Sequence, residues 1–348
     1  MRIGGWNQKG CLDWYIWRSQ LLLKTPVGLS LIYALQRQSG FLGLPEVVEA
    51  ELIDQVVEVG LEEAEKLANS FRKVRTLTDS PFDVPVPTKA ELEKKVKERL
   101  AELKPIIVRV PFTFEHAKAA LNMVIAKLPP NRPEHQQFKD SAIWQAVLTL
   151  SRDYTTRLVS NDRYFLLDRA DPSKGLAQNL LEDCQRARVT VTVHCDLSSC
   201  LEAIIRDVPS FEQTRLVSLI TGAFIPRLRA EAARHRFEII EPPDTKTQVF
   251  RTAQTNRLAV DFAITVPLIA DSVITDGRTD CRAIVRGSCY YDPEASSISG
   301  EFLWGSRFEW KYPYGGTAVM ARLPTGARVV ITILPEGARC VPQLSKPA

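Results

Sequence analysis

The stretch FKDSAIWQAVLTLSRDYTTRLVSNDRYF, residues 138–165, decides the fold of the first part of this chain. It opens with one acid and three apolar residues at spacings of three, four and three: Asp140, Ile143, Val147 and Leu150. These spacings place the four side chains on one face of a helix. We therefore predict a packed helix that carries a carboxylate in its first turn.

A strand is predicted after this helix. The run RLVS at 157–160 is strand-like and ends at Asn161 and Asp162. A helix of about 14 residues rises roughly 21 Å, and a strand at about 3.3 Å per residue recovers most of that distance. Asp162 therefore returns to the sheet edge at which Asp140 begins its helix. Open α/β sheets bind ligands at that edge, so the two acids form a candidate site.

The remainder of the first part alternates helical and strand patterns. Pro45 opens a helical stretch that runs toward Phe71, and Thr88 with Glu91 forms a capping box that begins another helix. A short strand follows at 106–110, and Thr113 begins a further helix. This alternation predicts an α/β domain over residues 1–185 with a mainly parallel central sheet.

The pattern changes toward the C-terminus. Residues 237–348 are rich in Val, Ile, Thr and aromatic residues with turn signals between runs, Asp276-Gly277 among them, which predicts a mostly antiparallel β-rich domain of unknown role. Residues 186–236 are predicted to form a helical connector. In it, Ser210 with Gln213 predicts a capping box, and Pro226 is expected to kink or end the helix.

Composition narrows the class of protein. Of 348 residues, 45% are hydrophobic and 25% charged, which excludes a disordered chain, and the net charge of +4 is too small to identify a nucleic-acid partner. The seven cysteines contain no Cys-x-x-Cys pair, so we interpret them as reduced thiols of a cytoplasmic protein. No export signal is found, and the apolar runs fall short of the roughly 20 residues that cross a bilayer, so no membrane partner is expected.

Three segments together resemble the PIN-domain nucleases, in particular the large bacterial PIN-like subgroup with a helical insert after the second acid. LPEVVEAEL (44–52) is similar to the family's Pro-x-x-Val-x-x-Glu segment. FKDSAIW is similar to its Asp-x-x-Ile helix, and LVSNDRYF to its (Thr/Ser)-Asn-Asp-x-x-Phe strand end. The resemblance covers residues 11–185 and implies a three-layer PIN-like domain.

The resemblance also implies which residues form the site. It carries over Glu51, Asp140 and Asp162 as catalytic, metal-binding acids, with Ser160 and Asn161 as supporting polar groups. The first acid of the family corresponds to Asp13. Here the sequence departs from the pattern, because Trp14 and Tyr15 follow Asp13 where the family has Thr-Asn or Thr-Ser.

Crowded carboxylates repel one another unless divalent cations neutralise them, and oxygen ligands suit Mg²⁺ or Mn²⁺. The resemblance implies a metal-dependent endoribonuclease that hydrolyses single-stranded RNA and leaves 5′-phosphate and 3′-hydroxyl ends. Arg152, Arg157 and Arg163 surround the acid pair and are candidates for substrate contact.

A second hypothesis stays open. Taken separately, Asp140 is also what a helix start favours and Asp162 what a turn favours. The chain would then be a catalytically weakened PIN-like module that binds RNA or protein. By analogy with the family, a homodimer and a toxin role with an antitoxin-like partner are further candidates.

Overall fold

The computed structural model describes residues 8–12, 14–78, 85–131, 137–205, 208–240, 242–270, 279–312, 316–322, 328–333 and 342–344. The chain divides into two compact units. The N-terminal unit comprises Met1–Lys24 and Gly28–Arg206, and the C-terminal unit comprises Thr25–Val27 and Asp207–Ala348. The fold is mixed α/β, as predicted, and among the described residues no helix is long and apolar enough to cross a membrane.

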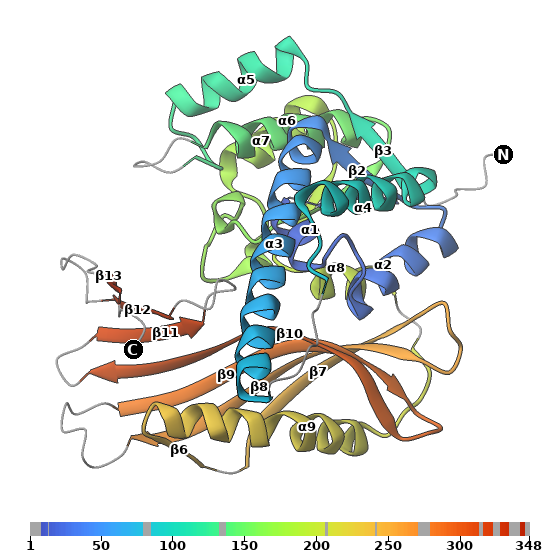
Figure 1. The fold of residues 1–348 in the computed structure, drawn as a ribbon. Coiled ribbons are helices and arrows are strands. Elements are labelled where there is room, and N and C mark those ends of the chain that lie inside the picture. The colour runs from blue at the N-terminus through green and yellow to red at the C-terminus, as the bar shows by residue number, and fades with distance from the viewer. Residues whose placement is uncertain are drawn as a thin grey trace. The chain divides into compact units, whose positions relative to one another are not determined.

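The N-terminal unit is built on a sheet of five strands (Figure 1). They are β1 (Gln8–Leu12), β2 (Phe41–Pro45), β3 (Ile107–Val110), β4 (Thr155–Val159) and β5 (Val191–His194). Their order is β3-β2-β1-β4-β5, and each neighbouring pair is parallel. The chain builds β2 and β3 on one side of β1 and then crosses to the other side for β4 and β5. The carboxyl ends of β1 and β4 therefore flank a topological switch point, where such sheets place their ligand sites.

Between residues 14 and 204 the described part of the chain forms eight α-helices. They are α1 (Trp14–Ser19), α2 (Pro26–Arg37), α3 (Glu46–Thr78), α4 (Lys89–Glu102), α5 (Phe114–Ile125), α6 (Phe138–Ser151), α7 (Gln178–Ala187) and α8 (Leu197–Ile204). Of these, α3, α6 and α8 contact strands of this sheet. The capping box predicted at Thr88 and Glu91 is confirmed, and Thr113 is the N-cap of α5. α6 contacts β2, β3, β4 and β5. Its side chains Ile143, Trp144 and Val147 are completely buried, which confirms the predicted buried face.

A left-handed turn precedes α2. Leu21, Leu22 and Leu23 have φ values of 46°, 57° and 60°, a conformation that is unfavourable for residues with a β-carbon. The Arg99 guanidinium of α4 stabilises the turn, because its Nε donates to the Leu22 carbonyl at 3.2 Å and its Nη2 to the Leu23 carbonyl at 3.3 Å. Gly28 makes room for it: a β-carbon at Gly28 would lie 2.6 Å from the Leu23 Cα.

Replacing this glycine should destabilise the N-terminal unit. We expect Gly28→Ala to lower the free energy of unfolding by about 1–3 kcal/mol, because the added methyl meets backbone that cannot yield cheaply. Gly222→Ala is the control. Gly222 lies in a helix of the C-terminal unit, Gln213–Arg234, where an added β-carbon would have nothing within 4 Å, so this substitution should raise the free energy of unfolding of the C-terminal unit by about 0.5–1 kcal/mol. Urea unfolding followed by circular dichroism measures both, and equal stability of Gly28→Ala and the wild type would contradict the expectation.

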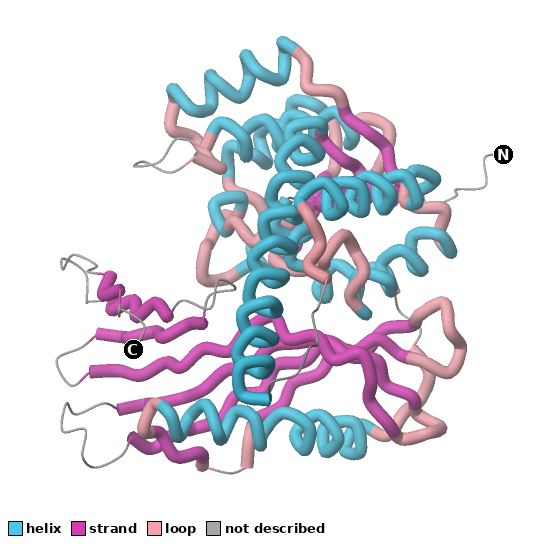
Figure 2. The backbone as a smooth tube through the Cα atoms, in the orientation of Figure 1, coloured by secondary structure: helices cyan, strands magenta, loops and turns pink. Residues whose placement is uncertain are grey.

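The C-terminal unit holds an antiparallel sheet of eight strands, which confirms the predicted β-rich part (Figure 2). The strands are β6 (Phe237–Ile239), β7 (Asp244–Arg251), β8 (Leu258–Ala270), β9 (Thr279–Asp292), β10 (Ser297–Tyr312), β11 (Gly316–Arg322), β12 (Arg328–Ile333) and β13 (Pro342–Leu344). The helix α9 (Gln213–Arg234) packs Leu216, Ile220 and Phe224 against the sheet side chains, Phe262 and Trp310 among them. The predicted turn at Asp276-Gly277 lies outside the described residues.

Residues 186–236 do not form a separate connector in this division. β5 pairs with β4, so it belongs to the N-terminal sheet, whereas α9 belongs to the core of the C-terminal unit. The division falls at 206/207 and not at 185 and 236. The capping box predicted at Ser210 is wrong, because α9 begins at Gln213 without a side-chain cap. Nor does Pro226 end the helix, which continues to Arg234 since Leu228 and Ala232 extend the same buried face.

Candidate functional site

The first turn of α6 lies at the carboxyl edge of the parallel sheet. Only three residues separate Ser151, the end of α6, from Thr155, the start of β4. The helix therefore runs toward the amino edge and the strand runs back, which places the first turn of α6 and the residues after β4 at one edge. Asp140 stands in that first turn, as predicted.

Hydrogen bonds of its backbone and of its carboxylate hold Asp162, the third residue after β4. Its backbone N–H donates to the Ser160 hydroxyl at 3.1 Å, and its Oδ1 accepts from the Tyr164 N–H at 2.9 Å. Its Oδ2 accepts from the Gln137 side-chain amide at 3.2 Å. Gln137 directly precedes α6, so this last bond joins the end of β4 to the start of the helix. The carboxylate is thus fixed by backbone and side-chain donors together.

A buried asparagine sets the position of Gln137. The Asn131 Oδ1 accepts from the Gln137 N–H at 2.8 Å, and the Asn131 Nδ2 donates to the Ser141 hydroxyl and the Leu128 carbonyl, both at 2.9 Å. Asn131 is 3% exposed and Ser141 is completely buried. Buried polar groups that satisfy one another in this way hold a single local geometry. The chain therefore enters α6 in a fixed position.

Glu51 reaches the same turn from the other side. It lies in the second turn of α3, which begins directly after β2, and its Oε1 accepts a hydrogen bond from the Lys139 ammonium. The side chain of Glu51 is 19% exposed. Its second oxygen, Oε2, is buried and has no hydrogen-bond partner among the described residues. A buried carboxylate oxygen without a donor is costly, and a hydrogen-bond donor or a cation would relieve that cost.

The structure thus brings three of the predicted acids to the first turn of α6. Asp140 lies within that turn, Gln137 bonds to Asp162, and Lys139 bonds to Glu51. Asp13, the fourth predicted acid, lies outside the described residues. Within the described part of the chain, no three or more His, Cys, Asp or Glu side chains form a group that could hold a metal ion.

The two predicted supporting residues differ in their surroundings. Ser160 is buried, donates its backbone N–H to the His194 carbonyl at 2.9 Å, and accepts from Asp162 through its hydroxyl. It therefore supports the acid directly and ties it to β5. Asn161, which lies between Ser160 and Asp162 in the sequence, is exposed. It is available to a ligand at the edge of the sheet.

The three predicted substrate arginines lie in three different places. Arg163 directly follows Asp162, is exposed, and donates to the Arg169 carbonyl at 2.8 Å. Arg157 lies within β4 and its Nη1 is 3.4 Å from the His194 Nε2. Arg152 follows the last residue of α6, about 18 Å along the helix from Asp140. Of the three, only Arg163 is placed beside the acids.

Two histidines near these arginines have a lowered pKa. Burial lowers the pKa of His194, and the positive charge of Arg157 lowers it further. Burial likewise lowers the pKa of His116, to which the charge of Arg152 adds. His116 contacts Thr149 near the end of α6.

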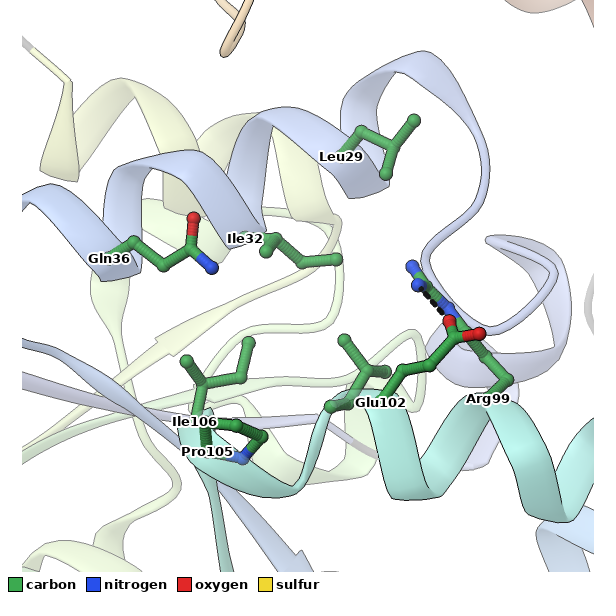
Figure 3. Close-up of a pocket in the computed structure, with 8 residues that line it drawn as sticks. Leu29, Ile32, Gln36, Arg99, Glu102, Pro105 and Ile106 are labelled. Atoms are coloured by element: carbon green, nitrogen blue, oxygen red, sulfur yellow. Dashed lines mark hydrogen bonds and ion pairs between the residues drawn. The ribbon is translucent and has the colours of Figure 1, made fainter.

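A cavity of about 180 Å³ lies elsewhere in the N-terminal unit, between α2 and the end of α4 (Figure 3). Leu29, Ile32 and Gln36 line it from α2, and Pro105 and Ile106 lie on the opposite side. Its charged residues, Arg99 and Glu102, pair with each other at 3.0 Å. Because this lining is largely apolar and its charges neutralise each other, the acid edge is the stronger candidate site.

No family model, curated protein or solved structure matches the chain. The resemblance to PIN-domain nucleases therefore stays a prediction from the quoted motifs.

Sequence analysis missed the residues that hold the acids. Lys139 adjoins Asp140 but has no role in the predicted site, and Asn131 and Gln137 precede the predicted helix, where the sequence carries no recognisable motif. The one signal available for Lys139 was a basic residue in the first turn of a helix, where the dipole disfavours it. Nothing in the sequence pairs it with Glu51, which is 88 positions away.

Removing the buried asparagine should loosen the start of α6. We expect Asn131→Ala to destabilise this region by about 1–3 kcal/mol, because the Gln137 N–H and the Ser141 hydroxyl lose their partner. Amide hydrogen exchange of peptides that cover the first turn of α6 should then accelerate by a factor of about 5 or more, which corresponds to the lower end of this energy range. Asn69→Ala, which removes only an exposed contact with Arg72, is the control. Unchanged exchange in Asn131→Ala would show that the network does not fix this turn.

Proposed function

We propose that this chain is a Mg²⁺- or Mn²⁺-dependent endoribonuclease that hydrolyses phosphodiester bonds of single-stranded RNA. The observation that carries the proposal is the convergence of Glu51, Asp140 and Asp162 on the first turn of α6, at the switch point of a parallel sheet. Asp13, the next residue after β1, completes the proposed set. The finer PIN-like, three-layer assignment of the N-terminal unit belongs to the same proposal.

The residue types at this edge are those that hard divalent cations prefer. All the proposed ligands offer oxygen, the donor that Mg²⁺ and Mn²⁺ prefer, and the buried Oε2 of Glu51 is an acceptor in need of a positive partner. When bound, the metal would neutralise the carboxylates and lower the pKa of a coordinated water. The hydrogen bonds with Ser160 and Gln137 would hold Asp162 in place at this edge.

The proposed reaction is a hydrolysis in line with the bond that breaks. A water oxygen bonds to the phosphorus, the bond from phosphorus to the 3′-oxygen breaks, and the leaving oxygen takes up a proton. The products are a 5′-phosphate and a 3′-hydroxyl. Arg163, exposed beside Asp162, is placed to contact the phosphates of the substrate.

Loss of one acid should abolish this activity. We expect Asp140→Asn to reduce metal-dependent cleavage of a labelled single-stranded RNA by a factor of 100 or more, because the amide cannot replace the charge of the carboxylate. Glu98→Gln, which alters an exposed carboxylate paired with Lys95 on α4, should retain wild-type activity. Cleavage is measured with Mn²⁺, with Mg²⁺ and with EDTA. Equal cleavage by the wild type and Asp140→Asn would refute the nuclease proposal for the RNA used.

Arg163, which follows Asp162, and Arg152, which follows the last residue of α6, give a second test. Arg163→Ala should weaken RNA binding by a factor of about 3–10, and should lower the slope of log K against log salt by about 0.7, because one phosphate contact is lost. Arg152→Ala, at the far end of α6, should change neither quantity. Fluorescence anisotropy over a range of salt concentrations measures both. An equal loss in the two variants would mean that RNA does not approach along the acid edge.

The alternative is a catalytically weakened RNA-binding or protein-interaction module. It is favoured by Trp14 and Tyr15 after Asp13 and by the ion pair that engages Glu51. Salt-sensitive RNA binding without metal-dependent cleavage would support it. We further propose a cytoplasmic location, which cell fractionation tests, and a homodimer, which sedimentation tests. Co-purification tests the proposal of an antitoxin-like partner protein.

A further inference from the structure

The ion pair between Lys139 and Glu51 joins two helices at the proposed metal site. The Lys139 ammonium, in the first turn of α6, donates to the Oε1 of Glu51 in the second turn of α3. We propose that Lys139 is a resident cation that a divalent metal must displace from Glu51, so that this lysine sets the metal affinity of the site. The inference rests on the proposed function.

The first argument is that the lysine satisfies only part of the carboxylate. An ammonium is a point charge that reaches one oxygen here, whereas the Oε2 of Glu51 stays buried without a partner among the described residues. A divalent cation carries twice the charge and can engage a carboxylate through both oxygens. The site therefore holds a cation already, but one that leaves part of the desolvation of Glu51 uncompensated.

The second argument is the position of the lysine on its helix. The N-terminal turn of a helix carries a partial positive charge and disfavours a cation. Lys139 lies in that turn, and its ion pair with Glu51 offsets the unfavourable position of its ammonium there. A divalent metal on Glu51 removes that attraction and adds repulsion. The ammonium and the metal therefore compete for the same carboxylate.

The third argument is an asymmetry in exposure. The side chain of Lys139 is 41% exposed and that of Glu51 is 19% exposed. Lysine has a long, flexible stem, so its ammonium can swing into water without moving the backbone. Glu51 stays in place because α3 is anchored at this level by completely buried Val48 and Leu52. The exchange then requires one side chain to leave and one metal to enter.

The test is calorimetric titration of the full chain with Mn²⁺ at constant pH and salt. We expect Lys139→Gln to bind Mn²⁺ about 10-fold more tightly than the wild type, because the competing charge is gone. Lys95→Gln, which removes the exposed partner of Glu98, is the matched control and should match the wild type. Glu51→Gln should bind weakly whether or not Lys139 is present. The rise in melting temperature that saturating Mn²⁺ causes is a second measurement, and we expect this rise to be larger for Lys139→Gln than for the wild type. If Lys139→Gln does not fold, Lys139→Met replaces it in both measurements.

The outcomes separate this inference from the proposed function. Equal or weaker Mn²⁺ binding by the Lys139 variants overturns it, even where the wild type cleaves RNA with metal. Absence of Mn²⁺ binding in the wild type and in both variants overturns it as well. Tighter binding by Lys139→Gln, abolished when Glu51→Gln is added, supports it even if no RNA is cleaved, and in that case only the nuclease proposal fails.

Discussion

The burial of α6 against the parallel sheet is the constraint on which the candidate site depends. Ile143, Trp144 and Val147 are completely buried, and a connection of three residues ties the end of this helix to β4. With both ends of α6 fixed in this way, its first turn has to lie at the carboxyl edge of the sheet. The hydrogen bonds that Asn131, Gln137 and Lys139 make with Ser141, Asp162 and Glu51 are all made in that turn or directly before it.

The carboxylates beside the first turn of α6 are partly removed from water, and each is stabilised by a different kind of hydrogen-bond donor. Asp162 receives hydrogen bonds from neutral donors, the Tyr164 N–H and the Gln137 amide. Glu51 receives a charged donor, Lys139, and keeps one oxygen unsatisfied. Neutral donors hold a carboxylate without competing for its charge, whereas an ammonium does compete. Glu51 is therefore the acid at which the proposed exchange of Lys139 for a metal would take place.

An element can be predicted from the sequence where neighbouring residues determine it, and cannot where residues far apart in the chain determine it. α6 and the capping box at Thr88 were predictable because periodicity and capping are local. β1 was not, since GGWNQKG is a poor pattern for a buried strand. Its backbone nevertheless pairs with β2 and β4 on both sides, and ladder hydrogen bonds do not depend on side chains. The bond from Lys139 to Glu51 joins residues 88 positions apart, so only the tertiary structure reveals it.

Pro226 shows the same limit in the other unit. A proline within a helix loses one backbone hydrogen bond and costs about 3 kcal/mol, so local reasoning ends or kinks α9 there. Phe224 and Ile225 before it and Leu228 and Ala232 after it all enter one core with the sheet. Burying side chains of this size contributes roughly 1.5–3 kcal/mol for each large one, which outweighs the lost bond. The helix therefore continues through the proline, and residues 207–348 acquire a core of their own, independent of the carboxylates on the parallel sheet.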